Sequence, residues 1–389
     1  MPGVWATVTN SQVFNWIKLI DQKGINTDCV SITNTKLSDD AVAKIEDDLG
    51  AKFYQISSFP YLIGDIYLFI YFLYLYLKSV IKYDKIIFQT RLPKIGIPFI
   101  LIGTLYKVKI IYEARGAITE ERIHVSRNRQ DKKLKFKFKT AYINLNEKLF
   151  IKLSDKVICV SNTLKKYYKK KYNLLNSKKF SVFPGAADNS LFYFDSNQNA
   201  RVRKELKFTD KDIVIIYSGK LKKDWEIPDD VFNYMAKLML HDKNIRFLVV
   251  TPDLETANFY SNKYNLTEKT VVLKSKFEEV NKYLNAADIS LMLREDVLMN
   301  NVASPTKFSE YILSGIPCIM SNGVYDFAQI IKETGFGVVL SDYSKLKKEE
   351  YNQIIKLLQI DRETISLWGR NNLSKENLIS KYFELLKHV

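Results

Sequence analysis

The sequence is poor in the residues that build covalent or metal frameworks: three of its 389 residues are Cys and three are His. The cysteines, Cys29, Cys159 and Cys318, lie far apart, so they do not form a disulfide framework, and no pair has the spacing of zinc ligands. Three histidines exclude a His-rich metal site. We therefore expect a protein of a reducing compartment, the cytosol.

Glycine and proline are also scarce, with 14 and nine residues, which excludes collagen-like and Pro-rich architectures. Apolar residues make up 47% and charged residues 26%, which is the usage of a globular protein and not of a disordered chain. One hydrophobic core rarely serves 389 residues, so the length predicts two domains of under about 200 residues each.

No hydrophobic run is long. The first residues, MPGVWATVTN, have no basic stretch followed by an apolar one, so we expect no signal peptide. The longest apolar segment, Ile66–Leu77, lies between Asp65 and Lys78 and is shorter than the ~20 residues that cross a bilayer. It predicts a helix that is apolar all round and buried, in preference to a helix that touches or spans a membrane.

Positive charge is concentrated in one half of the chain. The net charge is +16, and residues 1–190 hold 31 Lys and Arg against 16 Asp and Glu, whereas residues 191–389 hold 28 and 27. The most biased segment, Arg122–Lys139, has eight basic residues and one acid, with Phe136 and Phe138 interleaved, and a second basic cluster lies in 165–171. Such a segment is either a solvated helix face or a surface for an anionic partner: a nucleic acid, a membrane or a phosphorylated acceptor.

Short apolar strands alternate with helical patterns along the whole chain. We predict strands at 4–9, 29–33, 53–56, 85–88, 108–112, 156–160, 180–183, 213–217, 246–250, 270–273, 289–293, 318–320 and 337–340. Helices are predicted at 14–23, 66–82, 95–106, 163–172, 228–240, 278–286, 305–313, 326–332 and 374–388. This alternation is typical of parallel sheets covered on both faces. The predicted fold class is α/β, with two Rossmann-like doubly wound domains facing across a cleft.

The domain boundary is predicted within Pro184–Ser196, a segment rich in turn residues, which gives domains of 1–187 and 188–389. Ligands of open α/β sheets bind at the carboxyl ends of the strands, so we expect the site in the cleft between the domains. The last helix, with Ser374 as its cap, is expected to pack back on the first domain.

The segment 301–320, NVASPTKFSEYILSGIPCIM, carries the sharpest chemical signal. Ser304 is placed to cap a helix that begins at Pro305, and Lys307 and Glu310 then share one face of that helix. A helix N-terminus with a lysine beside it suits a phosphate, and a carboxylate suits sugar hydroxyls. The combination predicts a nucleotide-sugar site, although a plain helix with an i,i+3 ion pair shows the same pattern.

This segment resembles the P-x-K-x-x-E-Y-x-x-x-G-x-P segment of GT-B glycosyltransferases similar to glycosyltransferase family 4, of group 1. Further segments resemble the family in the same order: IIYEARGAITEE, SDKVICVSNTLKKYY, KFSVFPGAADNSLF, IVIIYSGKL and VNKYLNAADISLMLRED. The resemblance rests on motifs over 100–389 and on the element pattern alone over 1–100. It implies an acceptor-binding domain at 1–187 and a nucleotide-sugar-binding domain at 188–389.

The resemblance also implies roles for individual residues. Glu310 would bind the donor ribose, while Lys307 and the loop residues Gly219 and Lys220 would hold the diphosphate with the backbone of Ser304, Pro305 and Thr306. Arg294 would join the donor site, and Lys274 and Ser275 would lie near the base. The acceptor side would be formed by Asn10, Ser11, Glu113, Arg115, Gly116 and Glu120, of which Glu113 and Arg115 would act in catalysis together with Lys307.

The chain departs from the family pattern at two positions. The family has a second glutamate eight positions before the ribose-binding one, and here that position is Val302. The family also has a second cation five positions after the one that Lys220 matches, and here that position is Trp225, so Lys222 or Lys223 would have to substitute. The contact of the missing carboxylate with the transferred sugar is therefore in question.

The expected chemistry follows from charge. Breaking a sugar–phosphate bond builds negative charge on the leaving nucleotide, which either a divalent metal or lysine, arginine and a helix N-terminus must meet. The triplet Asp210-Lys211-Asp212 precedes a strand instead of ending one and is interpreted as a turn. We therefore expect metal-independent transfer with no cofactor besides the nucleotide-diphosphate sugar, and the resemblance implies retention of anomeric configuration without an enzymic nucleophile.

Other functions are compatible with parts of the sequence. A non-catalytic GT-B-like partner that stabilises another transferase fits the missing glutamate. A nucleic-acid binder fits the basic half, but no helix-turn-helix, zinc or RNP pattern supports it. A sugar-nucleotide epimerase would need acid/base carboxylates, for which Glu113 and Glu120 are the candidates. The favoured hypothesis is a transferase docked on the cytoplasmic leaflet, with a lipid-diphosphate-linked saccharide acceptor and a cell-surface polysaccharide as product.

Overall fold

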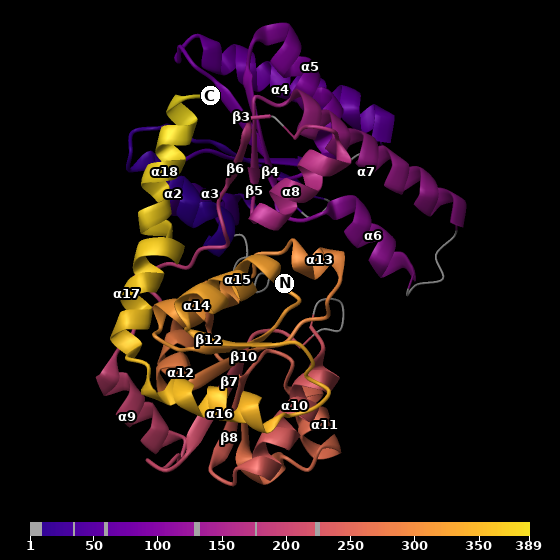
Figure 1. Cartoon of the computed structure of the whole chain (residues 1–389). Coiled ribbons are helices and arrows are strands. Elements are labelled where there is room, and N and C mark those ends of the chain that lie inside the picture. Colours follow the sequence, from indigo (N-terminus) through magenta and orange to yellow (C-terminus); the bar gives the residue numbers. More distant parts are fainter. Residues whose placement is uncertain (1–9, 34–35, 58–60, 128–132, 176, 222–225) are drawn as a thin grey trace. The chain divides into compact units, whose positions relative to one another are not determined.

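The computed structural model describes residues 10–33, 36–57, 61–127, 133–175, 177–221 and 226–389 (Figure 1). The chain forms two compact units: unit 1 comprises Met1–Cys159, Lys165–Val182 and Ile379–Val389, and unit 2 comprises Val160–Leu164 and Phe183–Leu378. The main division lies between Val182 and Phe183, slightly before the position expected from the sequence. Every named strand in the described residues pairs in parallel with its neighbours, which confirms the predicted α/β class.

Unit 2 is built on a six-stranded sheet of order β12-β11-β10-β7-β8-β9. Its strands are β7 (Ile213–Ser218), β8 (Ile245–Val250), β9 (Thr270–Leu273), β10 (Ile289–Met292), β11 (Cys318–Ser321) and β12 (Gly337–Leu340). Successive residues of a strand point to opposite faces, and both faces here are apolar. Ile215 of β7 belongs to one buried core, while its neighbours Val214 and Ile216 belong to the other. This two-sided burial explains why the strands have continuous apolar sequences.

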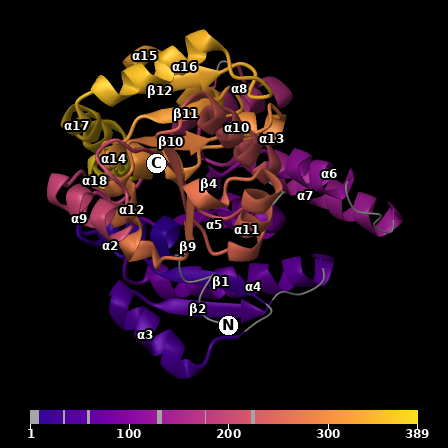
Figure 2. The ribbon, with the colours of Figure 1, turned by 90° about the horizontal axis from the view of Figure 1, so that it is seen from below.

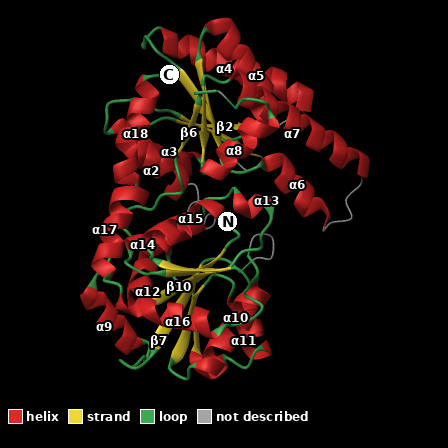
Figure 3. Ribbon diagram, in the orientation of Figure 1, coloured by secondary structure: helices red, strands yellow, loops and turns green. Residues whose placement is uncertain are grey.

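Helices cover both faces of this sheet (Figure 3). One core contains residues of α10 (Pro228–His241), α11 (Leu254–Lys263) and α16 (Lys348–Lys356). The other contains residues of α12 (Val280–Ala286), α14 (Thr306–Leu313), α15 (Tyr325–Thr334) and α17 (Arg362–Leu373). Unit 2 also holds α9 (Ser196–Glu205) and the short α13 (Leu298–Asn301). The result is the doubly wound arrangement predicted for the second half of the chain.

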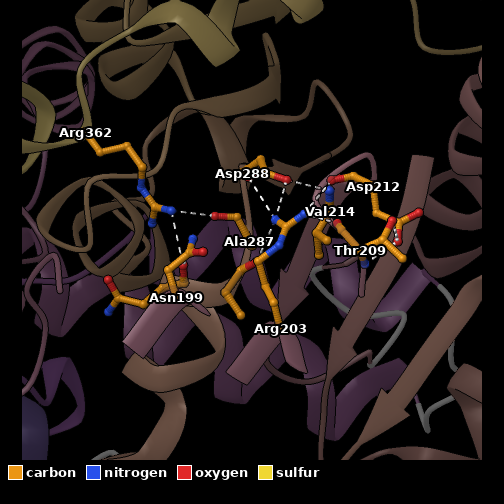
Figure 4. A network of polar contacts seen from close by, with 10 residues as sticks. Asn199, Arg203, Thr209, Asp212, Val214, Ala287, Asp288 and Arg362 are labelled. Atoms are coloured by element: carbon orange, nitrogen blue, oxygen red, sulfur yellow. Dashed lines mark hydrogen bonds and ion pairs between the residues drawn. The ribbon is translucent and has the colours of Figure 1, made fainter. Parts of the chain in front are cut away.

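A network of polar contacts anchors the amino ends of β7 and β10 (Figure 4). Arg203 of α9 donates to both carboxylate oxygens of Asp288, at 3.1 and 2.9 Å, and Asp288 accepts the backbone N–H of Val214 at 2.7 Å. Asp212 accepts the backbone N–H of Thr209 at 2.6 Å, which confirms that the Asp210–Asp212 triplet is a turn. The carboxyl ends of the strands, where ligands of such sheets bind, carry different residues.

Unit 1 has a four-stranded sheet of order β3-β4-β5-β6 and a separate pair, β1-β2. The strands are β1 (Cys29–Thr33), β2 (Phe53–Ser57), β3 (Ile87–Thr90), β4 (Lys109–Ala114), β5 (Lys156–Cys159) and β6 (Phe180–Val182). The helices are α2 (Asn15–Asp21), α3 (Asp39–Leu49), α4 (Tyr61–Val80), α5 (Gly96–Tyr106), α6 (Ile118–Arg127), α7 (Lys133–Leu153) and α8 (Asn162–Lys171). Helix α3 lies beside β2 (Figure 2). The strand predicted at 4–9 lies outside the described residues.

Helix α4 contradicts the prediction of a buried apolar helix. It is 20 residues long, and one face packs inward through Leu68 and Phe72, whose ring meets Phe88 of β3 and Phe99 of α5. Only 22% of the window Ile63–Val80 is buried, and this window is long and apolar enough to cross a membrane by length and composition alone. The apolar residues on its other side are therefore exposed.

The last helix, α18 (Lys375–Lys387), begins as predicted, because the Ser374 hydroxyl accepts the backbone N–H of Asn377 at 3.1 Å. Its residues from Ile379 onward belong to unit 1. There the Tyr382 hydroxyl donates to Gln89 of β3 at 2.6 Å, and the Tyr382 ring packs against Trp16 of α2.

Candidate functional site

The N-terminus of α14 is held by residues far away in the sequence. The Ser161 hydroxyl donates to the carbonyl of Val302 at 2.7 Å, and the backbone N–H of Gly185 donates to the Ser304 hydroxyl at 2.8 Å. A Cβ on Gly185 would lie 2.3 Å from the Ser304 carbonyl oxygen, so only glycine fits this approach. The predicted Ser304 cap is therefore wrong: the helix begins at Thr306 after Pro305, whose side chain provides no cap, and the dipole of the helix stays available to an anion.

Lys307 lies in the first turn of α14 and points back over β7. Its Nζ donates to the Tyr217 hydroxyl at 3.1 Å and to Glu226 Oε1 at 2.8 Å, and it stands 4.6 Å from the centre of the Tyr217 ring. Gly219, which follows β7 with φ of +113°, makes room for it, since a Cβ there would lie 2.4 Å from Lys307 Cε. Burial lowers the pKa of Lys307 from its ordinary value.

Arg294, which follows β10, completes a cation pair with Lys307. Its Nη2 donates to the same Glu226 oxygen at 2.8 Å, so one carboxylate bridges the two cations. Burial alone would raise the pKa of Glu226, but Lys307 and Arg294 hold that pKa below its ordinary value. Glu226 Oε2 and Arg294 Nε are buried and find no hydrogen-bond partner among the described residues. One N–H of Arg294 is therefore left unpaired by the described residues.

Glu310 lies one turn after Lys307 on α14 and is 8% exposed. Burial raises its pKa to about 7, against the opposing influence of Lys307, the Thr306 hydroxyl and Lys375. Lys375, the first residue of α18, is itself buried, and burial lowers its pKa. Glu310 is therefore a carboxyl group whose charge changes near neutral pH.

The structure brings together only part of the predicted donor set. Gly219, Arg294 and Lys307 meet at the carboxyl ends of β7 and β10, with Ser304, Pro305, Thr306 and Glu310 on or beside α14. Lys220 follows Gly219 and is exposed. Lys274 and Ser275 follow β9, the edge strand, two strands away from β7. Within the described residues, Lys220, Lys274 and Ser275 form no hydrogen bond or ion pair with Lys307 or Arg294.

Sequence reasoning missed Glu226 and Tyr217. This loop was expected to supply a second cation, and Lys222, Lys223 and Trp225 lie outside the described residues. The structure places an acid next to them, between two cations supplied by other segments. An acidic residue in a loop expected to be basic was the available signal. Tyr217 had no signal, because its position in a buried strand is typical of core residues.

In unit 1 the carboxyl ends of β3 and β4 carry a second polar cluster. Glu113 accepts from Arg91 at 2.8 Å, from Gln89 at 3.0 Å and from Arg115 at 3.2 Å. Burial alone would raise the pKa of Glu113, but the two guanidinium groups hold that pKa below its ordinary value. Arg115 also donates to Gln12 at 3.1 Å. Glu113 is therefore an ionised anchor for two arginines and is poorly suited to carry a proton.

The other acceptor-side residues are placed differently. The Gly116 carbonyl accepts the Tyr168 hydroxyl at 2.9 Å, and Glu120 pairs with Lys171 at 2.8 Å in a network around the buried Glu147. No hydrogen bond in the described part of the chain joins Glu120 to Glu113. Asn10 and Ser11 begin a helical turn, Asn10–Phe14, and their side chains lie outside what the structure describes.

Several known proteins share this architecture. Residues 198–373 match the family described as glycosyl transferases group 1. HepE of Anabaena, solved in complex with UDP, has a TM-score of 0.69 at 10% identity, with 97% of this chain and 96% of that chain covered. A glycosyltransferase from Rickettsia africae has a TM-score of 0.67 at 14% identity, with 98% of this chain and 96% of that chain covered. WaaG, a glycosyltransferase involved in lipopolysaccharide biosynthesis, has a TM-score of 0.61 at 14% identity, with 97% of this chain and 95% of that chain covered. No curated protein matches the chain.

At these identities the solved structures show the fold, over almost the whole chain. The family match falls within unit 2, on the sheet that carries Gly219, Arg294 and Lys307. Fold and family match agree with the motif resemblance: the chain has the GT-B fold, and its residues 198–373 match the group 1 glycosyltransferases.

Proposed function

We propose that the protein transfers a sugar from a nucleotide-diphosphate donor to a lipid-linked saccharide, with retention of anomeric configuration and without a metal ion. The product would be a cell-surface polysaccharide made at the inner face of the membrane. The observation that carries the donor half of this proposal is the cation pair of Lys307 and Arg294 beside the uncapped N-terminus of α14.

This arrangement suits a departing diphosphate. The leaving group gains negative charge as the sugar–phosphate bond breaks, and fixed donors aimed at that charge lower the barrier. Lys307 and Arg294 supply two full charges, and the helix N-terminus adds partial positive charge. These groups deliver to the phosphates the kind of stabilisation that a divalent cation would otherwise provide. The solved structures of HepE contain UDP or UDP-glucose, which supports a nucleoside diphosphate as the ligand.

Glu226 acts as a positioning residue in this proposal. Its carboxylate is bonded to both cations, so it holds them near each other and keeps both charged in a buried setting. The Tyr217 ring and hydroxyl fix the other side of Lys307. The donor diphosphate then meets a cation pair that is already assembled, and it takes over the counter-ion role that Glu226 fills in the free protein.

Glu310 is proposed to accept hydrogen bonds from the ribose hydroxyls. It is buried one turn from Lys307, and a carboxylate is the natural acceptor for a diol. The family's other glutamate is replaced by Val302, which is buried and whose carbonyl binds Ser161. The transferred sugar is therefore proposed to be held without a carboxylate at that position, and the donor phosphate to take the acceptor proton.

The acceptor is proposed to bind unit 1 through the Arg91–Glu113–Arg115 cluster. Two guanidinium groups anchored by one buried carboxylate form a preorganised site for phosphate or saccharide oxygens. WaaG is a glycosyltransferase involved in lipopolysaccharide biosynthesis, which supports a cell-surface saccharide as the product class. The excess of positive charge in residues 1–190 supports an anionic, lipid-linked acceptor.

Nucleotide binding and turnover test the donor half of the proposal. A panel of nucleoside diphosphates should raise the melting temperature of the wild type, and the best of them identifies the donor base. Lys307→Ala should abolish that shift and reduce kcat by about 10²–10³-fold, the scale of one lost electrostatic donor. The control is Lys332→Ala, a change at an exposed lysine of α15. Equal turnover in both variants would refute the site, and loss of all activity in EDTA would refute metal independence.

A non-catalytic role is the second candidate, and the buried Val302 in place of a carboxylate is the observation that favours it. In that case the protein stabilises another transferase and has no need of a donor. Calorimetry separates the two functions, because a partner protein would show no nucleoside-diphosphate affinity and no donor hydrolysis, whereas the transferase would show both.

A further inference from the structure

Unit 1 exposes an apolar face along helix α4. The exposed positions recur every three or four residues, so they share one side of the helix. At 1.5 Å per residue, this stripe is about 30 Å long. The side chains are 40–86% exposed, and they are Ile63, Ile66, Tyr67, Ile70, Tyr74 and Leu77 of α4 and Ile81 just beyond its end. Soluble proteins rarely leave such a continuous stripe in water.

Two neighbouring helices extend this face. Helix α5 packs between α4 and α7: Phe99 of α5 meets Phe72 of α4 and Phe150 of α7. Asp65 of α4 and Tyr142 of α7 are also hydrogen-bonded to each other. The three helices therefore form one layer against the four-stranded sheet. The exposed apolar side chains that α5 and α7 add to it are Leu101, Leu105, Leu134, Phe138 and Leu145.

The charges on this layer have one sign. The acids within α4, α5 and α7 are Asp65 and Glu147, and both are buried. The exposed charged residues on these helices are lysines. On α7, Lys137, Lys148 and Lys152 share one side of the helix with the exposed Leu134, Phe138 and Leu145. A helix face of lysines and apolar side chains is the pattern of interfacial membrane helices.

We infer that the outward faces of α4, α5 and α7 form a membrane-docking surface that lies on an anionic bilayer. The apolar stripe of α4 would sit in the headgroup–acyl boundary, and the lysines of α7 would contact anionic headgroups. Helix α4 lies on the bilayer and does not cross it, because its opposite face is committed to the sheet through Leu68 and Phe72. This inference deepens the proposed function by specifying how the enzyme reaches a lipid-linked acceptor.

Charge argues against a second copy of the chain as the occupant. A two-fold contact brings the same patch of both copies together, so the lysines of α7 would face lysines. No exposed acid on these three helices is present to pair with them. An anionic lipid surface satisfies both the apolar stripe and the lysines.

Vesicle flotation of the full-length protein tests the surface. Vesicles of phosphatidylcholine with phosphatidylglycerol should bind the wild type, and binding should weaken with added salt. The variant I66S/I70S/L77S should bind more than about tenfold less, because three apolar side chains are lost from the interface. Its control is L240S/F259S/L367S, which changes three apolar residues of unit 2 that are 56–87% exposed, against 52–65% for the first set. Equal loss of vesicle binding in both variants, or no loss in I66S/I70S/L77S, overturns the inference.

The lysines require their own variant. K137Q/K148Q/K152Q should weaken binding by about fivefold for each lysine removed, and only to vesicles that contain phosphatidylglycerol. The control K243Q/K332Q/K348Q removes three exposed lysines of unit 2 and should bind as the wild type does. Equal binding of the two variants would overturn the electrostatic part of the inference.

Depth and self-association complete the test. In Ile70→Trp, brominated lipids should quench the added fluorescence, whereas in Leu240→Trp they should not; quenching in neither variant overturns the placement of α4. Sedimentation velocity tests whether a second copy of the chain covers this face instead. If the wild type is a dimer that dissociates in I66S/I70S/L77S, and if the wild type binds no vesicles, the face joins two copies and the inference is overturned. These measurements need no turnover, so their failure leaves the transferase assignment intact, and failed nucleotide binding leaves the docking surface intact.

Discussion

Replacing Glu226 by glutamine should make the free protein less stable and its affinity for a nucleoside diphosphate higher. The glutamine side chain has the size of glutamate, and its oxygen still accepts a hydrogen bond from Lys307 or Arg294. The negative charge between the two cations is lost, however, and the side chains of Glu226 and Arg294 are only 8 and 9% exposed. Two like charges then remain close together in a site where water screens them poorly.

The magnitude follows from the burial of the group. Breaking a buried ion pair by neutralising one partner costs about 3–5 kcal/mol, because the other partner is left uncompensated. Taking the lower figure, a unit of this size should melt about 6–12 °C lower. A diphosphate restores the missing negative charge, so the ligand-induced rise in melting temperature should be larger in Glu226→Gln than in the wild type.

The assay is thermal unfolding with and without the preferred nucleoside diphosphate. Glu205→Gln is the control, because Glu205 forms an exposed pair with Arg201 and its loss should change stability by less than about 1 kcal/mol. An unchanged melting temperature in Glu226→Gln, or a smaller ligand-induced rise than in the wild type, would show that Glu226 is not the internal counter-ion of the cation pair.

Three further predictions concern residues around the same sheet. Gly219→Ala should weaken nucleoside-diphosphate binding measured by calorimetry, because its Cβ would collide with Lys307 and a φ of +113° disfavours alanine; unchanged affinity would contradict this. The wild type should lose stability as the pH rises from about 4.5 to 7, because burial raises the folded-state pKa of Glu310 to about 7 and the contribution of this group to stability is complete only below its unfolded-state pKa. Glu310→Gln should not show this loss, and urea unfolding across the same pH range measures it. Asp288→Ala should cost about 3 kcal/mol in urea unfolding by stranding Arg203, while KM for the donor stays unchanged; an altered KM would show that this network reaches the site.

The sequence predicted the strands of unit 2 well, because burial on both faces makes them continuous apolar runs. Strands 270–273 and 337–340 agree residue for residue with β9 and β12. It did not predict α7, whose lysines and phenylalanines do not form a simple amphipathic pattern. It also misassigned α4, since a helix that is apolar on all sides looks the same whether its outer face meets protein or lipid. The tertiary contacts of residues such as Leu68 and Phe72 separate the two faces.

Within the site, sequence reasoning found the residues that share one helix and missed those that meet through the fold. Lys307 and Glu310 follow from local spacing, whereas Glu226 reaches Lys307 across 81 positions of the chain. Ser304 was expected to cap α14, but the approach of Gly185 takes its hydroxyl. A side chain with two possible partners is assigned by tertiary structure, and local pattern carries no information about that choice.

The way the start of α14 is held has a consequence for how the molecule is made. Ser161 and Gly185 reach Val302 and Ser304 across 141 and 119 positions. Closing such long loops is slow, and a chain emerging from the ribosome has no such partner until residue 304 has been synthesised. The start of α14, where the donor diphosphate is proposed to bind, therefore forms late in biogenesis. A nascent or truncated product that stops before this point holds most of unit 1 but lacks the proposed donor site.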